Sequence, residues 1–293
     1  MKKVLFFILT VFFTLISVSL YADENSDDKN MPDPYSPSMI KAFADDLYQN
    51  GFWDEAESEY KRYLFTYDNT ENPDYVPDST VVFKLASMYH TTQDTDGAVW
   101  LSKTFSDQVP IEISEKLFIN SAGMAFKKRD INLFNSLINP LVPDFSKDIQ
   151  LLVPISIALL DKDVPLVTTL LTQASEEYQI FLPSATLAQN YKTKNPGLAM
   201  CLSIILPGSG KWYTGSFSSF LTSFCTIGAF TAGTIWTGIE SEWKDFRPYV
   251  FGTCALVFYI ADIYGAYKSA QRYNEYQYRM LEESVDLIYE ELF

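Results

Sequence analysis

The last third of the chain places the strongest constraint on the fold, because it holds three apolar runs and a glycine-rich turn. The runs cover 197–206, 216–239 and 248–266, and the turn after the first run reads Pro-Gly-Ser-Gly-Lys-Trp-Tyr-Thr-Gly. About 20 consecutive apolar residues are enough for a helix to cross a bilayer. The pattern therefore predicts an α-helical membrane domain over residues 195–270.

The number of membrane segments is left open by the lengths of these runs. The first run is too short to cross alone, and the other two form an antiparallel hairpin around the polar loop 240–247. If only two segments cross, Lys211 and Lys268 lie outside the cytoplasm, against the positive-inside trend. If the first run also inserts as a thin span, both lysines become cytoplasmic. This charge bias favours three segments, and two remain the alternative.

The turn and a later acidic residue form the candidate motif of this membrane domain. The motif residues are Pro207, Gly208, Gly210, Tyr213, Gly215 and Asp262. Glycines allow the close, irregular backbone path that a reversal at membrane depth requires. A P-G-x-G-x-x-Y-x-G turn with a late intramembrane Asp resembles small bacterial membrane domains related to the short two-helix "TM-two" family, most of which have no known function.

Asp262 has two interpretations, because an acid inside a membrane span is costly and faces either a partner or a cavity. One is a structural hydrogen bond to the glycine turn or to a neighbouring backbone. The other is an ion or proton relay. We favour the structural role, since two or three spans make a poor transporter unless the chain oligomerises.

The first 22 residues predict a signal peptide. Lys2 and Lys3 precede an apolar run that ends at Leu20, and Ala22 stands before an acidic stretch. Cleavage after Ala22 is the expectation, with an uncleaved anchor as the alternative. In both cases the following residues leave the cytoplasm, first an acidic flexible segment over 23–36 and then a helical domain over 37–190.

The helical domain contains a pattern of paired helices. Small and apolar residues recur at helical spacing across 39–68 on both sides of Gly51, which suits a left-handed turn. This pattern resembles the tetratricopeptide repeat. The resemblance implies that Ala44, Gly51 and Ala56 let two helices approach closely, and that Tyr60 is the aromatic residue of the second helix.

A second copy of the pattern follows over 81–105. Ala86 and Ala98 stand in the matching small positions, but Gln93 replaces the turn glycine. Residues 113–138 and 149–181 predict two further helix pairs without the repeat signature. A solenoid of such pairs offers a surface for other proteins or peptides.

Composition argues against several classes of function. The chain has 37 acidic and 22 basic residues, a formal charge of −15, which disfavours nucleic acid as a partner. All three cysteines lie in the apolar third, so the helical domain has no disulfide framework. With a single histidine, the usual nucleophile–base pairs cannot be assembled. We expect no catalytic, metal or cofactor site, unless a pocket pairs Asp45 or Asp46 with another carboxylate.

The sequence therefore predicts an all-α protein: a tetratricopeptide-like helical-repeat solenoid, a short α-helical transmembrane domain, and an amphipathic helix over 271–293. The expected role is a non-enzymatic scaffold or adaptor in the bacterial cell envelope, in the inner membrane with its helical domain in the periplasm. Its expected partners are other envelope proteins or peptides and membrane lipid, with homo-oligomers possible. The alternative is a small transport or channel subunit that works through Asp262.

Overall fold

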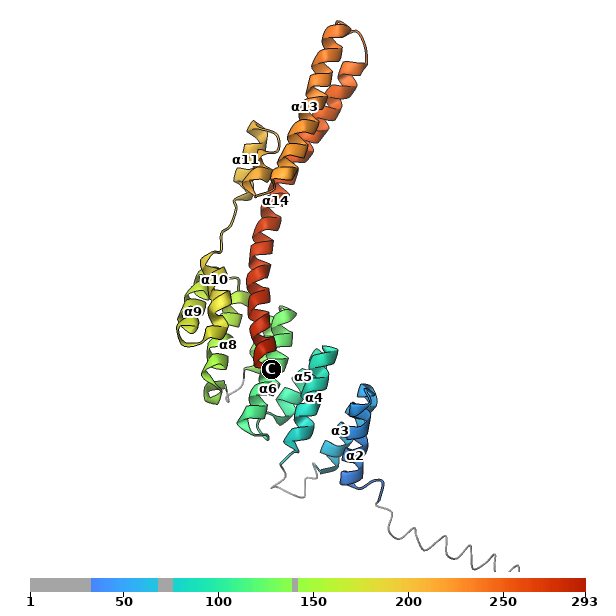
Figure 1. Ribbon diagram of the computed structural model, residues 1–293, viewed down its shortest axis with the longest axis vertical. Helices are drawn as coiled ribbons and strands as arrows, with labels where there is room; N and C mark the ends of the chain where they lie inside the picture. Colours follow the sequence, from blue (N-terminus) through green and yellow to red (C-terminus); the bar gives the residue numbers. More distant parts are fainter. Residues whose placement is uncertain (1–32, 68–75, 139–141) are drawn as a thin grey trace, which may run out of the picture. The chain divides into compact units, whose positions relative to one another are not determined.

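The computed structural model describes residues 33–67, 76–138 and 142–293 (Figure 1). Within these ranges every regular element is a helix and no strand is present, which confirms the all-α class. The chain divides into two compact units, residues 1–118 and 119–293. The expected signal peptide and most of the acidic segment after it lie outside the described residues.

The first unit is built from helical hairpins. Helix α2 (Pro37–Gln49) pairs with α3 (Trp53–Tyr67), and α4 (Ser79–Thr92) pairs with α5 (Thr95–Phe105). Helix α6 (Ile111–Lys127) runs from this unit into the second. The small and aromatic residues expected at the helix contacts are all buried, namely Ala44, Ala56, Tyr60, Ala86 and Ala98.

The turns between paired helices share one backbone geometry. Gly51, Gln93, Arg129 and Lys162 each have a positive φ between 56° and 79°. After each of them, the next backbone N–H donates to a carbonyl five residues earlier, as in a Schellman helix end. Three of the four are followed directly by an Asp whose side chain caps the next helix. Gln93 thus makes the left-handed turn without glycine, helped by its capping neighbour.

The second unit continues with short helices and then the apolar third of the chain. Its elements after α6 are α7 (Ile131–Leu137), η2 (Val142–Asp144), α8 (Lys147–Leu160), α9 (Val164–Glu177), η3 (Gln179–Phe181), α10 (Leu182–Gln189), α11 (Pro196–Ile205), α12 (Ser209–Tyr213), α13 (Phe217–Glu240) and α14 (Arg247–Leu292). Helices α8 and α9 form the hairpin expected over 149–181.

Helix α14 joins two segments that the sequence analysis treated as separate. The third apolar run and the expected amphipathic helix over 271–293 form one uninterrupted helix of 46 residues. At 1.5 Å per residue it is about 69 Å long. Its continuity has a simple cause, because the chain has neither Gly nor Pro between Ala266 and Leu292 to end a helix. Residue 270, the expected boundary between the membrane domain and the amphipathic helix, therefore lies inside one continuous helix.

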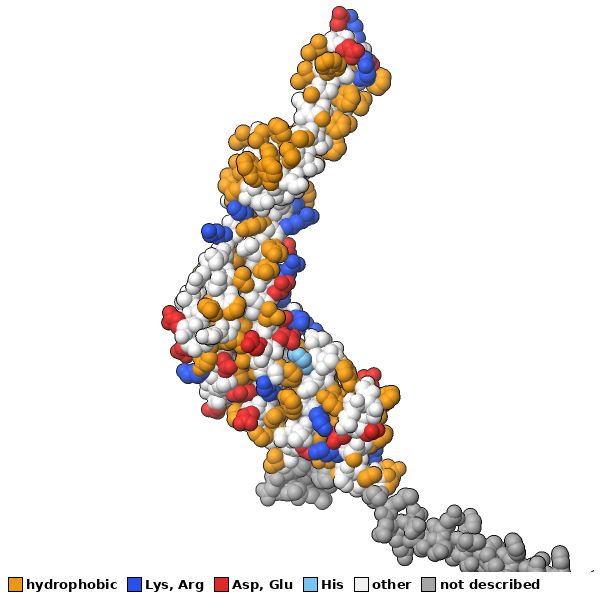
Figure 2. Space-filling view, viewed as in Figure 1, with side chains coloured by type: hydrophobic (Ala, Val, Ile, Leu, Met, Phe, Trp, Pro, Cys, Tyr) orange, Lys and Arg blue, Asp and Glu red, His pale blue; other side chains and the backbone are white. Residues whose placement is uncertain are grey.

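The two halves of α14 lie in different surroundings. The apolar first half is exposed, because only 11% of its most apolar 18-residue stretch is buried. Figure 2 shows hydrophobic side chains gathered on the surface of this part of the molecule. The second half is packed into the second unit, where Leu281, Val285, Ile288 and Tyr289 are buried. Among the residues that the structure describes, α14 is the one helix long and apolar enough to span a membrane.

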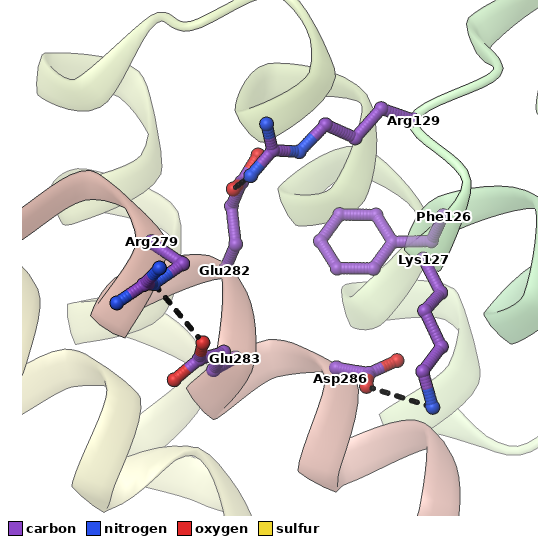
Figure 3. Close-up of a pocket in the computed structure, with 7 residues that line it drawn as sticks. All are labelled: Phe126, Lys127, Arg129, Arg279, Glu282, Glu283 and Asp286. Carbon is purple, nitrogen blue, oxygen red and sulfur yellow. Dashed lines mark hydrogen bonds and ion pairs between the residues drawn. The ribbon is translucent and has the colours of Figure 1, made fainter. Parts of the chain in front are cut away.

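Polar contacts hold the second half of α14 against the end of α6, against the loop that follows it and against α8. Glu282 pairs with Arg129, and Lys127 Nζ lies 3.7 Å from Asp286 Oδ2, around a pocket of about 250 Å³ (Figure 3). The hydroxyl groups of Ser156 and Tyr289 are 2.7 Å apart in the interior. Burial raises the pKa of the Asp286 carboxyl, although Lys127 opposes this shift. The second half of α14 is thus held by ion pairs at the end of α6 and by a buried pair of hydroxyl groups at α8.

Candidate functional site: the glycine turn and Asp262

The glycine turn reverses the chain between α11 and α12. Gly208 has φ +85°, and a Cβ atom there would lie 2.7 Å from the carbonyl oxygen of Phe220. Both facts exclude a side chain at this position. Gly215 ends α12 at φ +90°, where a Cβ atom would meet nothing within 4 Å. Gly208 is therefore needed both for its left-handed backbone conformation and for its close packing against Phe220. Gly215 is needed only for its left-handed backbone conformation.

Asp262 reaches this turn from the middle of α14. Its Oδ2 accepts a hydrogen bond of 2.6 Å from the backbone N–H of Gly208, and its Oδ1 lies 2.8 Å from Lys211 Nζ. Lys211 also donates to Ser223 Oγ of α13 at 2.7 Å. The Asp262 side chain is 2% exposed and that of Lys211 is 20% exposed. A buried carboxylate, an ammonium group and a backbone amide thus join α12, α13 and α14; we call Gly208, Lys211, Ser223 and Asp262 the latch.

Gly210 lets α11, α12 and α14 approach each other closely. A Cβ atom at Gly210 would come within 2.0 Å of the Ala199 carbonyl oxygen and 2.7 Å of Ala266 Cβ. Its N–H donates to the buried Ser203 Oγ at 3.2 Å. Ala199 and Ala266 are fully buried in a small cluster with Ala270, against which Tyr213 packs. The second glycine of the motif is therefore required by a backbone contact.

The α11–α12 hairpin contacts α14 at its entrance, along its length and at its exit. At its entrance, Lys194 and Asn274 exchange two hydrogen bonds of 2.7 and 2.8 Å between the Lys194 backbone and the Asn274 amide. At its deepest point, Tyr259 donates to the Ile204 carbonyl oxygen. At its exit, the hydroxyl groups of Thr214 and Ser269 are 2.6 Å apart. Tyr213 returns to the entrance, where its hydroxyl accepts from the Asn195 N–H.

The α11–α12 hairpin is short and folds back on itself. Helix α11 has ten residues, about 15 Å, and the chain then turns back beside it. The number of membrane segments stays a prediction.

The structure brings together most of the expected motif residues. The Gly208 N–H donates a hydrogen bond to Asp262, while Gly210 and Tyr213 pack on the same face of α14. Ser203, Ser223 and Asn274 were not expected as partners, and neither was the pairing of Lys211 with Asp262. A signal for Lys211 was present, since an isolated cation three residues after Gly208 is a natural counter-ion for an isolated intramembrane acid.

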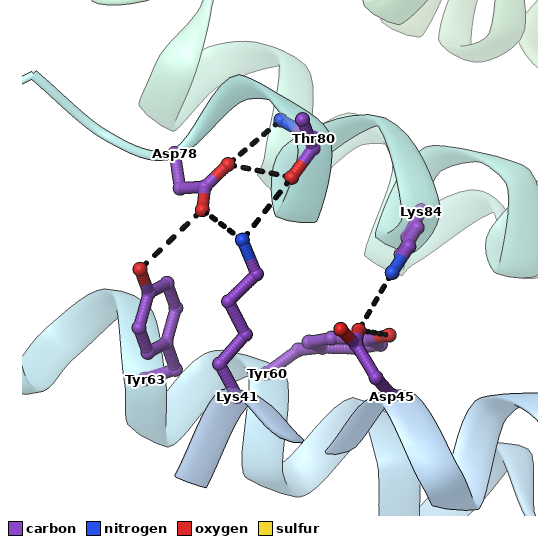
Figure 4. Close-up of polar contacts among 7 residues, drawn as sticks. All are labelled: Lys41, Asp45, Tyr60, Tyr63, Asp78, Thr80 and Lys84. Carbon is purple, nitrogen blue, oxygen red and sulfur yellow. Dashed lines mark hydrogen bonds and ion pairs between the residues drawn. The ribbon is translucent and has the colours of Figure 1, made fainter. Parts of the chain in front are cut away.

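The arrangement joins α12, α13 and α14 through hydrogen bonds and one ion pair. The described residues hold no group of three or more His, Cys, Asp or Glu side chains placed for a metal ion. In the first unit, Asp45 accepts hydrogen bonds of 2.6 Å from both Tyr60 and Lys84, so its neighbours are a phenol and an ammonium group (Figure 4). Asp46 contacts the Asn50 amide. Neither carboxyl group forms the paired acids that an enzyme hypothesis would need.

No protein-family model matches this chain, and no curated protein and no solved structure matches it. The resemblances to the tetratricopeptide repeat and to the TM-two type of membrane domain therefore stay predictions.

Proposed function

We propose that this chain is a membrane-anchored, non-enzymatic adaptor whose last helix links the bilayer directly to a helical binding domain. The observation that carries this proposal is the division of α14 into an exposed apolar half and a half packed among α6 to α10. A contiguous exposed apolar surface of this kind marks contact with lipid or with another protein. Because the helix has no break, movement at its membrane end is transmitted to the packed end.

Helix α13 is the proposed second membrane segment. It has 24 residues, and its single Asp, Glu, Lys or Arg is Glu240 at the end. Its abundant hydroxyl groups lower its hydropathy, but they are largely satisfied within the helix. Thr222, Thr231, Thr234 and Thr237 each donate to the carbonyl four residues earlier. Such hydroxyls can be accommodated in lipid, so α13 and the first half of α14 would cross together, braced by the re-entrant α11–α12 hairpin.

We place the helical domain in the periplasm of a bacterial cell, on the far side of the inner membrane. The signal-peptide pattern of the first 22 residues supports export. Loop 240–247 would then be cytoplasmic, and Lys194 and Lys268 would be external. The export signal precedes every other segment and determines this orientation in our proposal, against the charge bias of the later loops.

The helical pairs are the proposed binding surface for envelope proteins or peptides. The positive-φ residues Gln93 and Arg129 are 36 residues apart, and Arg129 and Lys162 are 33 apart. These intervals lie close to the period of about 34 in tetratricopeptide arrays. The first hairpin also exposes aromatic side chains, with Phe43, Phe52 and Phe65 each more than half exposed. Exposed aromatic residues are typical of binding surfaces.

Cysteine accessibility tests the anchoring and the orientation together. In a chain whose three cysteines are replaced by Ser, we would introduce either Thr193→Cys beside the domain or Lys244→Cys in the loop between α13 and α14. With intact spheroplasts, a membrane-impermeant maleimide should label the first and reach the second only after permeabilisation. Labelling of both from one side would contradict the membrane hairpin. The reverse pattern would leave the hairpin in place and overturn export.

The transport alternative has one supporting observation. Asp262 and Lys211 border a pocket of about 220 Å³ between α13 and α14 that is also lined by the hydroxyls of Thr222, Ser223 and Thr226. A relay would need Asp262 to exchange a proton, so Asp262→Asn would abolish function while accumulating normally. The adaptor predicts that this variant both accumulates and functions. Complementation by Asp262→Asn, with protein level measured, separates the two.

A further inference from the structure

We propose that a basic pocket beside the latch binds the phosphate group of an anionic phospholipid headgroup. The pocket has a volume of about 350 Å³ and lies between the first turn of α13 and the middle of α14. Its charged lining residues are Lys211, Lys268 and Arg272, and no acidic side chain lines it. The proposal rests on the membrane insertion put forward above.

Two of the three cations have charge available for a ligand. Lys211 is neutralised by Asp262 at 2.8 Å. Lys268 donates to Gln271 Oε1 at 3.0 Å, a neutral partner that leaves its charge uncompensated. Arg272 is exposed and has no ion pair or hydrogen bond among the described residues. A phosphodiester carries one negative charge, and an Arg guanidinium can hold two of its oxygen atoms at once.

Hydroxyl groups complete the donors of the pocket. Ser219 lies in the first turn of α13, where the helix dipole favours an anion. The Ser269 hydroxyl is 2.6 Å from the Thr214 hydroxyl, so it stabilises the wall of the pocket in addition to being a possible hydrogen-bond donor to a ligand. Tyr264 presents its phenol from α14. Cations and hydroxyls around one cavity match the oxygen-rich surface of a phosphate group.

One face of α14 changes from apolar to basic at this pocket, which favours a lipid over a free phosphate. Val257, Ile260 and Tyr264 lie on this face at helical spacing, and each is more than half exposed. Lys268 and Arg272 continue the same face at the next two turns. An acyl chain along Val257 and Ile260 would bring its headgroup to the two cations, with Tyr264 at the interface. A free phosphate would make no use of the apolar part.

The test is a lipid titration of the full-length protein in detergent, followed by native mass spectrometry. The probes are palmitoyl-oleoyl phosphatidylglycerol and the zwitterionic phosphatidylcholine with the same chains. The wild type should bind the anionic lipid more tightly, and Lys268→Gln/Arg272→Gln should weaken that binding at least about tenfold. Arg272→Gln alone should weaken binding less. Because Arg272 makes no ion pair or hydrogen bond within the described part of the chain, this single variant replaces the double variant if the latter misfolds. The charge-preserving Lys268→Arg/Arg272→Lys should retain binding.

The matched control removes two positive charges near the same end of the membrane hairpin but outside the pocket. Lys192→Gln/Lys194→Gln should change binding less than about twofold if the pocket itself is the site. Equal losses in both double variants would mean diffuse attraction and would overturn the proposal, as would no loss in the pocket variant. Competition by millimolar inorganic phosphate without competition by phosphatidylcholine would assign the pocket to free phosphate instead. Alkaline carbonate extraction tests insertion separately, so a failure of anchoring is distinguishable from a failure of lipid binding.

Discussion

Two lysine–carboxylate pairs in different regions of the molecule have almost the same geometry and very different surroundings. Lys211 and Asp262 are 2.8 Å apart, with side chains 20% and 2% exposed. In the first unit, Lys84 and Asp45 are 2.6 Å apart, with side chains 31% and 28% exposed (Figure 4). Both pairs join helices that are distant in sequence. Only the latch removes a carboxylate from water almost completely.

Burial, rather than the distance between the charged atoms, determines how much such a pair contributes to the stability of the protein. An exposed pair contributes on the order of 0–1 kcal/mol, because water and salt screen it. Breaking a buried pair by removing one partner costs about 3–5 kcal/mol, because an uncompensated charge is left behind. We therefore expect the latch to fix one arrangement of α12, α13 and α14. The pairs around Asp45 should add only modestly to the packing of the first hairpins.

The largest effect should come from breaking the latch on one side. Lys211→Met leaves the Asp262 carboxylate buried without its cation and should lower the free energy of unfolding by about 3–5 kcal/mol. Asp262→Leu should cost less, since the more exposed Lys211 ammonium can turn toward water. Asp262→Asn, which can still accept from Gly208, should be mildest. Denaturation of the detergent-solubilised protein and membrane accumulation measure these differences.

The double variant Lys211→Met/Asp262→Leu is the control for this series. Because it removes both charges, it should be more stable than Lys211→Met alone. If the two single losses simply add in the double variant, the residues act independently and the latch is not a coupled pair.

A smaller effect should follow from adding one methyl group to the turn. Gly210→Ala places a Cβ atom in the space occupied by the Ala199 carbonyl, and overpacking of this kind costs about 1–3 kcal/mol or more. Gly228→Ala in α13 is the matched control, since a Cβ atom there meets nothing within 4 Å. If the two variants have equal thermal stabilities, the close approach of Gly210 to the Ala199 carbonyl does not contribute to stability.

The packing of the first hairpin can be tested in the same way. Ala56 is fully buried, so Ala56→Trp should destabilise the helical domain by about 1–3 kcal/mol. Ser58→Trp, on the exposed side of α3, should have little effect. If Ala56→Trp unfolds at the same denaturant concentration as the wild type, the small residues of this hairpin are not its packing determinants.

The smallest effect concerns the partly exposed pairs and depends on pH. Burial would raise the pKa of Asp78, but hydrogen bonds from Lys41 and Thr80 outweigh it and lower the pKa to about 2. Because this value is below the unfolded value of about 3.9, the stabilisation is present above pH 4 and is lost as the pH falls toward 2. We expect a loss of about 1 kcal/mol or less, reduced further by salt. Asp78→Asn should flatten this part of the stability–pH curve, and an unchanged slope would exclude Asp78 as its source.

The sequence was informative wherever a feature depended on residues close together in the chain. The turn at Gly51 and the buried positions of Ala44 and Ala56 follow from local chemistry and helical periodicity. The continuity of α14 into its second half was also indicated by the sequence, because no Gly or Pro occurs between Ala266 and Leu292. The change from apolar to amphipathic composition near residue 270 suggests a boundary, but a change of composition alone does not end a helix.

The partners within the candidate site could not be derived in this way. Lys211 and Asp262 are 51 residues apart, and Asn274 is 80 residues from Lys194, so their contacts depend on how α11 folds back against α14. A ten-residue apolar run is compatible with a thin span or with a re-entrant helix. The contacts of α11 with α12 and α14 are the basis on which we propose the second.

The central claim is that one unbroken α14 connects the membrane to the packed helices, and a distance measurement tests it most directly. Spin labels at Tyr249→Cys and Tyr276→Cys, both exposed positions, would be introduced in a chain whose native cysteines are replaced by Ser and which is reconstituted in lipid bilayers. A continuous helix places these positions about 40 Å apart, at 1.5 Å per residue. The account predicts a narrow distribution centred near that distance in double electron–electron resonance. A broad distribution, or one centred well below it, would show a break in α14 and contradict the account.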